Sequence, residues 1–219
     1  MTRTSPFLSL IPAALIALAL PAGPAAAQAP EPVAGTRQAR AGEPRPEPKP
    51  QPRPHGTKVA VDPALVEVDD GDTVVIRWSK GDPEIVRVLG IDTPETRHPQ
   101  HDLPYAQPFG PEARGFAQGA FAAATQVELL RAPTLDPYGR TLGYLFLNGR
   151  NYSVLVIQAR YSAETVTHYG DNGLPAPAAE VLAAAKVAGP LPFEPPYVFR
   201  ARLRELSKWL KERGLEAEE

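Results

Sequence analysis

The chain has 219 residues, 27 of them proline, with a formal net charge of −2 and no cysteine. This length holds one ordinary globular domain once export and linker segments are subtracted. The lack of cysteine excludes disulfides, thiolate metal sites and lipid attachment through an N-terminal cysteine, so we expect the hydrophobic core alone to stabilise the domain.

The charge is distributed unevenly along the chain. Residues 28–58 carry six Lys or Arg and three Asp or Glu, a net of +3, whereas residues 61–219 carry 16 and 22, a net of −6. An acidic domain does not attract phosphates through its overall field. Any binding of phosphate must therefore come from a few local cations.

The first residues have the pattern of an export signal. Arg3 precedes an apolar stretch at residues 7–20, and three alanines at 25–27 precede Gln28. This order is typical of a signal peptide, and we predict that residues 1–27 are removed. The apolar stretch contains proline and is short for a membrane span, so an uncleaved anchor is the less favoured alternative.

Residues 28–58 are predicted to be a basic, disordered, proline-rich linker. Prolines alternate with polar residues from 44 to 54, which removes amide donors and leaves few apolar side chains. Such a tract favours an extended polyproline spacer. Two interpretations stay open: a solvated spacer, which we favour, or a basic arm that holds nucleic acid or envelope polymers.

The rest of the chain, 59–219, is predicted to be one folded domain. Short runs of Val, Ile and Leu between turn residues are typical of small-barrel strands, and we expect strands at 64–68, 73–78, 84–91, 126–130 and 140–147. Helices are predicted from Gly110, where proline and a carboxylate open the first turn, at 152–160, and over a last stripe of Phe199, Leu203, Leu206 and Leu210. An Ala- and Pro-rich segment at about 171–196 is interpreted as an insertion without an assigned function, although residues 178–187 could form a further helix.

Acidic residues concentrate at two turns next to predicted strands. The first is DDGDT at 69–73 and the second is DTPE at 92–95. Clustered carboxylates without cysteine or paired histidine suit Ca²⁺ or Mg²⁺, and not zinc. Taken singly, each cluster is also typical of ordinary turn chemistry.

Two arginines stand out from their surroundings. Strand alternation places Arg87 on one face with Ile85, Leu89 and Ile91, where a charge needs a partner. That partner could be one of the acids above, in a purely structural ion pair. The second, Arg140, follows the turn DPYG at 136–139, which alone would be a solvated loop.

Together these motifs resemble the staphylococcal nuclease family in order and spacing. The resemblance extends from about residue 66 to 169 and resumes more loosely in the last helix. It rests on Asp70-Gly71-Asp72-Thr73, on Arg87 five residues before Asp92-Thr93-Pro94-Glu95, on Gly110-Pro111-Glu112-Ala113, and on Asp136-Pro137-Tyr138-Gly139-Arg140. It implies an α+β fold, mainly β, with a five-stranded OB-type Greek-key β-barrel and three helices.

The resemblance also implies a metal site and a catalytic carboxylate. Asp72, Asp92 and the backbone carbonyl of Thr93 would hold one Ca²⁺, and Glu95 would stand beside it. A divalent ion offsets charge that grows on phosphate oxygens, while a neighbouring carboxylate can deprotonate or orient the attacking water.

The two arginines and two tyrosines would then contact the substrate. Arg87 and Arg140 would bind the same phosphoryl group from two sides through paired hydrogen bonds. Tyr138 and Tyr169 would shape the nucleotide pocket, with ordinary packing tyrosines as the alternative.

The chain departs from the family at several positions. Pro137 and Gly170 stand where the best-known member has lysines, and the loop 97–109 lacks its basic run. The scattered histidines are interpreted as loop residues and not as zinc ligands: His98, His101 and His168.

These inferences predict an exported, calcium-dependent endonuclease that hydrolyses DNA or RNA, or both, to products with 3′-phosphates. The mature chain would be a monomer without a transmembrane segment or a stable protein partner, located in the periplasm, in the envelope or outside the cell. The alternative is a noncatalytic OB-type module that binds nucleic acid or another anionic polymer at the cell envelope. The enzyme is favoured because both arginines and all three acids are present together.

Overall fold

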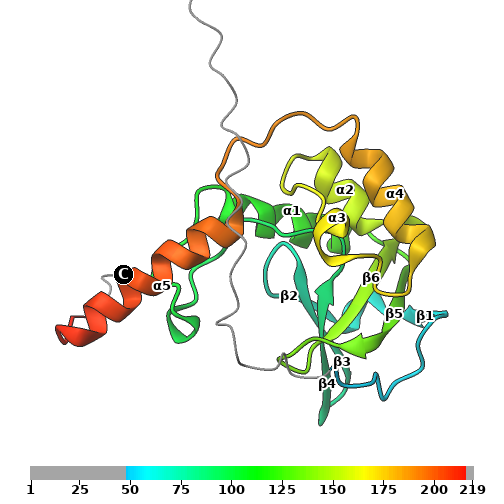
Figure 1. Ribbon diagram of the computed structural model, residues 1–219. Helices are drawn as coiled ribbons and strands as arrows, with labels where there is room; N and C mark the ends of the chain where they lie inside the picture. Colours follow the sequence, from blue (N-terminus) through cyan, green and yellow to red (C-terminus); the bar gives the residue numbers. More distant parts are fainter. Residues whose placement is uncertain (1–47, 216–219) are drawn as a thin grey trace, which may run out of the picture. The chain divides into compact units, whose positions relative to one another are not determined.

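The computed structural model describes residues 48–215 (Figure 1). The predicted signal peptide and most of the predicted linker lie outside the described residues. Within the described part, no helix has the length and apolar character needed to cross a membrane.

One curled sheet forms the centre of the described domain. Its seven strands are β1 (Lys58–Val61), β2 (Val66–Val68), β3 (Thr73–Ser79), β4 (Asp82–Val88), β5 (Val127–Leu135), β6 (Thr141–Leu147) and β7 (Arg150–Asn151). The order is β1-β5-β6-β4-β3-β2, with β7 beside β6. Only the β4–β6 pair among these is parallel. This curled sheet with its helices is the α+β, OB-type fold predicted from the sequence, with β1 and β7 as strands beyond the five expected.

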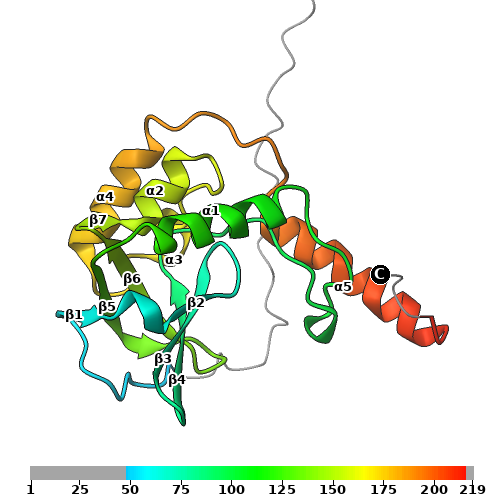
Figure 2. The same ribbon diagram turned by 180° about the vertical axis from the view of Figure 1, so that it is seen from behind.

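Five α-helices and two short 3₁₀ turns complete the described domain. They are α1 (Gly110–Ala122), α2 (Tyr152–Gln158), α3 (Val166–Tyr169), α4 (Pro175–Ala185), α5 (Pro196–Glu212), η1 (Pro63–Leu65) and η2 (Pro99–His101). Helices α1 to α4 gather around the sheet, whereas α5 lies beside the loop before α1 (Figures 1 and 2). Three helices were expected; α4 corresponds to the further helix considered at 178–187, and α3 adds to the prediction.

The main core lies between the sheet and the helices α1, α2 and α4. Alternating residues of β4 point into it, and Val86 and Val88 are almost fully buried. Arg87 lies on the opposite face with Ile85, which is 46% exposed. Arg87 therefore shares a face with Ile85, as the alternation predicted, but that side of β4 is open, and Leu89 and Ile91 lie beyond the end of the strand.

Helix α4 falls within the segment that was interpreted as an insertion. Its Ala178, Val181 and Ala184 are buried in the main core. At Gly90, a Cβ would lie 3.2 Å from the methyl groups of Val181, so this glycine permits the close approach of α4. Helix α5 is separate, because Phe199 and Leu203 form a second small cluster with Leu103.

Residues 48–58 differ from the disordered linker that their prolines predicted. The amide of Gln51 donates to Pro133 O at 2.9 Å, and Leu135 N donates to Lys49 O at 2.9 Å. The alternation of proline with other residues explains this pairing. Every second residue is a proline without an amide N–H, but the residues between the prolines keep their amides, and these amides point to one side of the extended segment. This segment thus covers the outer edge of β5, which β1 covers further along.

Candidate active site

The turn between β2 and β3 directs Asp72 into the interior. Its side chain is buried, and its Oδ2 accepts from the amide of Thr93 at 2.8 Å and from the Thr93 hydroxyl at 3.2 Å. A Cβ at Gly71 would lie 2.6 Å from the Thr93 hydroxyl, so only glycine permits this approach. Burial would raise the pKa of Asp72, but the charge of Arg87 and the Thr93 amide bring that pKa below its ordinary value.

Arg87 joins the two acidic turns. Its guanidinium forms ion pairs with Asp72 and, at 3.0 Å, with Asp92. It also donates to the carbonyl of Ile91 at 3.2 Å. Arg87 thus forms the ion pair with the acids that was considered as an alternative, and the surrounding acids hold its pKa above the ordinary value despite burial.

Asp92 and Glu95 follow β4 on a segment that is fixed through its backbone. Ser162 is 1% exposed; its hydroxyl accepts from the amide of Asp92 at 2.8 Å and lies 3.0 Å from the Asp92 carbonyl oxygen. The carbonyl of Glu95 accepts from the Gln107 amide at 2.9 Å. A Cβ at Gly110 would lie 2.1 Å from that carbonyl, so the first residue of α1 must be glycine.

The carboxyl group of Glu95 lies in a buried and mostly negative environment. Burial raises its pKa, and the charges of Asp72 and Asp92 raise it further, whereas Arg200 opposes them. These mutual effects place Asp72, Asp92 and Glu95 in one group.

Arg200 of α5 is a member of this group that the sequence did not indicate. It donates to both carboxylate oxygens of Asp92 at 2.9 Å each, and it forms an ion pair with Glu95. In sequence it lies 108 residues from Asp92. The one local signal is its place beside the buried Phe199 in a helix that carries many basic residues.

The described contacts of Arg140 do not include the acids of this group. Its Nε donates to Asp136 at 2.7 Å, and its guanidinium lies 5.7 Å from the ring centre of Tyr138. In the parallel pairing of β4 and β6, Val86 is opposite Thr141 and Arg87 is opposite Leu142. Side chains alternate along a strand, so Arg140 lies on the Arg87 side of the sheet.

The two tyrosines do not belong to the core. Tyr138 is 82% exposed and Tyr169 is 66% exposed, so the packing role considered for them does not hold. Tyr138 lies beside Arg140, whereas the described ring contact of Tyr169 is an edge-on one with His168 at 4.5 Å. The described contacts connect neither tyrosine to the acids.

The donor set fits a hard divalent cation. Asp72, Asp92 and Glu95 offer carboxylate oxygens at one place, and the buried Thr93 directly follows Asp92 and donates its amide to Asp72. Oxygen ligands of this kind suit Ca²⁺. A cationic group, the guanidinium of Arg200, already bridges Asp92 and Glu95, which shows that positive charge is stable there.

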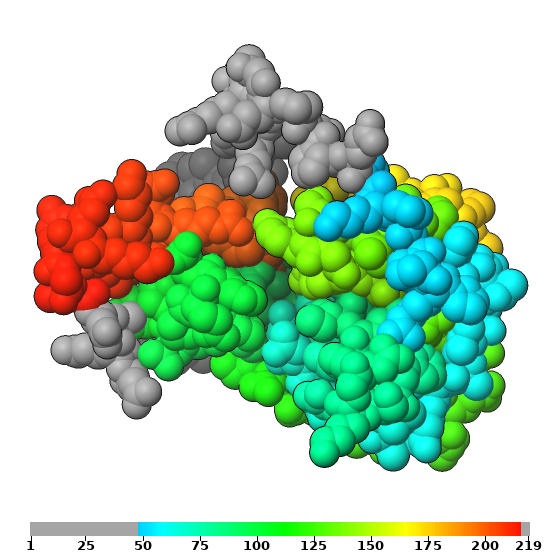
Figure 3. Space-filling model, turned by 90° about the horizontal axis from the view of Figure 1, so that it is seen from below, coloured from blue at the N-terminus to red at the C-terminus, as the bar shows by residue number. Residues whose placement is uncertain are grey.

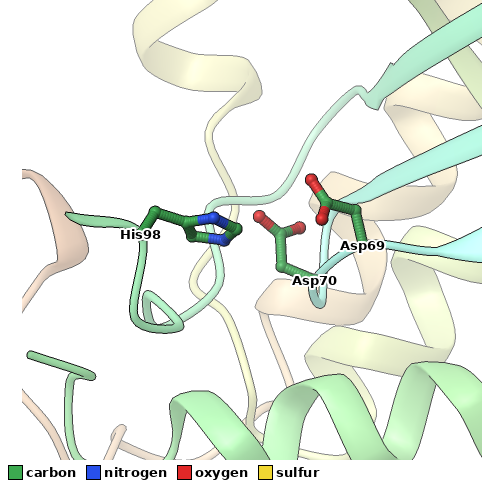
Figure 4. Close-up of side chains that lie close together, drawn as sticks. All are labelled: Asp69, Asp70 and His98. Atoms are coloured by element: carbon green, nitrogen blue, oxygen red, sulfur yellow. The ribbon is translucent and has the colours of Figure 1, made fainter. Parts of the chain in front are cut away.

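A second polar group is formed by the turn that carries Asp72 and by His98 of the loop after β4. Asp69, Asp70 and His98 have potential ligand atoms within 4.8 Å of one another (Figure 4). His98, expected to be a plain loop histidine, does lie in the loop after β4, and its Nε2 is 2.7 Å from the Thr96 hydroxyl. Burial and the charge of Asp72 raise the pKa of Asp70 well above its ordinary value.

Comparison with known proteins covers the part of the chain that carries most of this acid and arginine group. Residues 85–186 match the family described as staphylococcal nuclease homologue. Over this range the chain is similar to that family. The matched range includes Arg87, Asp92, Glu95 and Arg140; Asp72 precedes it and Arg200 follows it.

Several curated proteins are similar to part of the chain. A thermonuclease of Staphylococcus intermedius is 39% identical over 88 residues, which are 40% of this chain and 49% of that protein. The SPbeta prophage-derived endonuclease YokF of Bacillus subtilis (strain 168) is 34% identical over 121 residues, 52% of this chain and 40% of that protein. Endonuclease YncB of the same organism is 29% identical over 121 residues, 52% and 56% of the two chains. The chain thus spans about half the length of the curated relatives it matches.

Proposed function

We propose that this protein is an exported, monomeric, calcium-dependent endonuclease that hydrolyses phosphodiester bonds of DNA or RNA, or both, and leaves 3′-phosphates. One observation carries the proposal: Asp72, Arg87, Asp92 and Glu95 lie in one buried group, within a domain whose relatives are named thermonuclease and endonuclease. Export rests on the signal-peptide pattern of residues 1–27 alone.

Asp72, Asp92 and the carbonyl of Thr93 would hold the cation. When bound, Ca²⁺ supplies positive charge to a phosphate oxygen as negative charge grows there. Glu95 would take a proton from the attacking water. Its raised pKa makes it a stronger base than an ordinary carboxylate.

The two arginines would stabilise the phosphoryl group as its charge increases. Arg87 is oriented by its ion pairs with Asp72 and Asp92. Arg140 uses its Nε for Asp136, and among the described contacts its terminal nitrogens remain for phosphate oxygens. The exposed Tyr138 beside Arg140 would offer a ring on which a base can stack.

The direct test is hydrolysis by the full chain. Single- and double-stranded DNA and RNA are incubated with Ca²⁺, Mg²⁺ or EGTA, and the product ends are identified. We expect cleavage with Ca²⁺, 3′-phosphate products and no cleavage in EGTA. Full activity in EGTA would contradict the proposal, and binding of nucleic acid without cleavage would favour the noncatalytic module instead.

A further inference from the structure

Helix α5 brings a cationic side chain into the proposed metal site. Arg200 contacts both oxygens of Asp92 and one oxygen of Glu95. All three side chains are mostly enclosed, with 22%, 14% and 13% of their surfaces exposed. Both terminal nitrogens of Arg200 bind the Asp92 carboxylate, one to each oxygen. This paired geometry is that of a specific ion pair and not of a passing surface contact.

The helix that carries Arg200 is attached mainly to one loop. Phe199 and Leu203 pack on Leu103, and Lys211 pairs with Asp102. Figure 3 shows the orange-to-red surface of α5 against the green surface of this loop region. A cluster of three buried residues buries far less apolar area than the main core, so α5 can open locally at a lower cost than the barrel.

A guanidinium and a divalent cation at the same carboxylate repel each other and compete for its lone pairs. Arg200 contacts both oxygens of Asp92, and Arg87 contacts one of them as well, so a cation there would compete with Arg200. A role for Arg200 as a third phosphate ligand would also require it to leave Asp92 and Glu95. In either case, filling of the cation site begins with the loss of the Arg200 ion pairs.

We propose that Arg200 is a tethered counter-ion that a divalent cation displaces from Asp92 and Glu95, so that α5 sets the cation concentration at which the site fills. The inference rests on the proposed function only in taking Asp92 and Glu95 as part of the cation site. Arg200 lies outside the part of the chain that matches the family, so this control belongs to the C-terminal helix of this chain.

Calorimetric titration of the full chain with Ca²⁺ alone tests the proposal. The test variant is Arg200→Gln, and the matched control is Arg202→Gln, on the same helix but exposed and paired with Glu194. Arg200→Gln should bind Ca²⁺ about ten- to a hundredfold more tightly, the range expected for loss of a competing charged hydrogen-bond pair. Arg202→Gln should match the parent chain. Equal or weaker binding by Arg200→Gln would overturn the proposal.

A second measurement follows the helix itself. Hydrogen exchange of the amides of residues 196–212 is recorded in the parent chain with and without Ca²⁺. We expect faster exchange in the first turns of α5 when Ca²⁺ is bound, and unchanged exchange would refute displacement. Neither measurement uses hydrolysis, so the two proposals can fail separately. A chain that binds Ca²⁺ as predicted but cleaves nothing would contradict the proposed nuclease function. A chain that cleaves nucleic acid, but whose two glutamine variants bind Ca²⁺ equally, would contradict this inference alone.

Discussion

At the scale of single residues, Arg87 combines two roles that a substitution can separate. Its charge compensates the buried Asp72 and Asp92, and its planar fork would bind the phosphoryl group. Lysine keeps the charge but not the fork, so it can stay paired with the acids without making two parallel hydrogen bonds. Alanine would instead leave buried carboxylates without a partner and destabilise the fold.

Arg87→Lys should therefore fold and yet lose activity. We expect hydrolysis to fall by roughly a hundredfold or more, as for removal of a group that acts on the transition state. Steady-state kinetics with Ca²⁺, together with a thermal melt, provide the check. Arg77→Lys is the control, because Arg77 pairs with Glu67 on the exposed surface; near-parental turnover in Arg87→Lys would show that Arg87 is structural only.

Glu95 is held by its backbone, which makes its side chain replaceable without disturbing the segment. Gln107 and Gly110 both contact its carbonyl. Glu95→Gln should slow hydrolysis by about a hundredfold or more, since an amide cannot accept the proton of the water. Calorimetry should still detect Ca²⁺ binding, and Glu112→Gln on exposed α1 serves as the control. Complete loss of Ca²⁺ binding would instead make Glu95 chiefly a ligand.

At the scale of elements, strand β4 places one charged residue, Glu84, in the buried interior. Glu84 accepts two hydrogen bonds from Arg131 at 2.7 Å, and one each from Thr141 and Trp78 at 2.7 Å. Burial would raise the pKa of Glu84, but these donors bring it below the ordinary value. Every oxygen of this carboxylate is thus bonded within the barrel.

Glu84→Gln should destabilise the domain strongly. It leaves the charge of Arg131 buried without its partner, and we expect a loss of about 3–5 kcal/mol in the free energy of unfolding. Glu67→Gln removes the exposed pair with Arg77 and should cost less than about 1 kcal/mol. Denaturant unfolding at neutral pH measures both, and equal effects would contradict the buried network.

The same pair predicts the sign of a pH effect. Because the folded-state pKa of Glu84 is below its unfolded value of about 4.3, its contribution to stability is full above that unfolded value. It is lost as the pH falls through the lower folded pKa. Glu84→Gln should therefore show a shallower loss of stability in this acidic range than the parent chain.

At the scale of the whole described domain, the segment 48–58 completes the barrel at the edge of β5. Gln51 is 6% exposed, and its side chain donates to the hydroxyl of Thr141 at 3.2 Å. Arg131 also donates to Pro54 O at 3.1 Å, so the segment joins the network around Glu84. A covered edge also protects the sheet from pairing with other chains.

Gln51→Ala should accordingly reduce stability although it lies in a proline-rich tract. We expect a loss of about 1–3 kcal/mol, from a cavity and lost buried hydrogen bonds. Gln118→Ala on the exposed face of α1 should change little. Thermal unfolding of the full chain compares them; an unaffected Gln51→Ala would mean that this segment does not add to the stability of the barrel.

Local patterns in the sequence carried much of the fold and of the candidate site. The apolar runs of β3, β4 and β6 and the Gly-Pro-Glu start of α1 are properties of neighbouring residues, so the OB-type fold could be predicted. The spacing of Asp72, Arg87 and Asp92 was informative for the same reason: Asp72 and Asp92 flank the hairpin of β3 and β4, and Arg87 lies near its end. The assigned roles of these residues, and of Thr93, Tyr138 and Tyr169, stay predictions.

The strand pattern, the acid and arginine motifs and the family that these motifs resemble could therefore be read from the sequence alone. Only the tertiary structure decided that Arg200 pairs with Asp92, that Glu84 finds Arg131 and that a proline tract covers an edge strand. These contacts join residues 47 to 108 positions apart, and no local period records such a distance. A buried charge or a free amide is stabilised by the partner that the folded chain places next to it. The residues adjacent in sequence to either partner carry no information about which distant residue that will be.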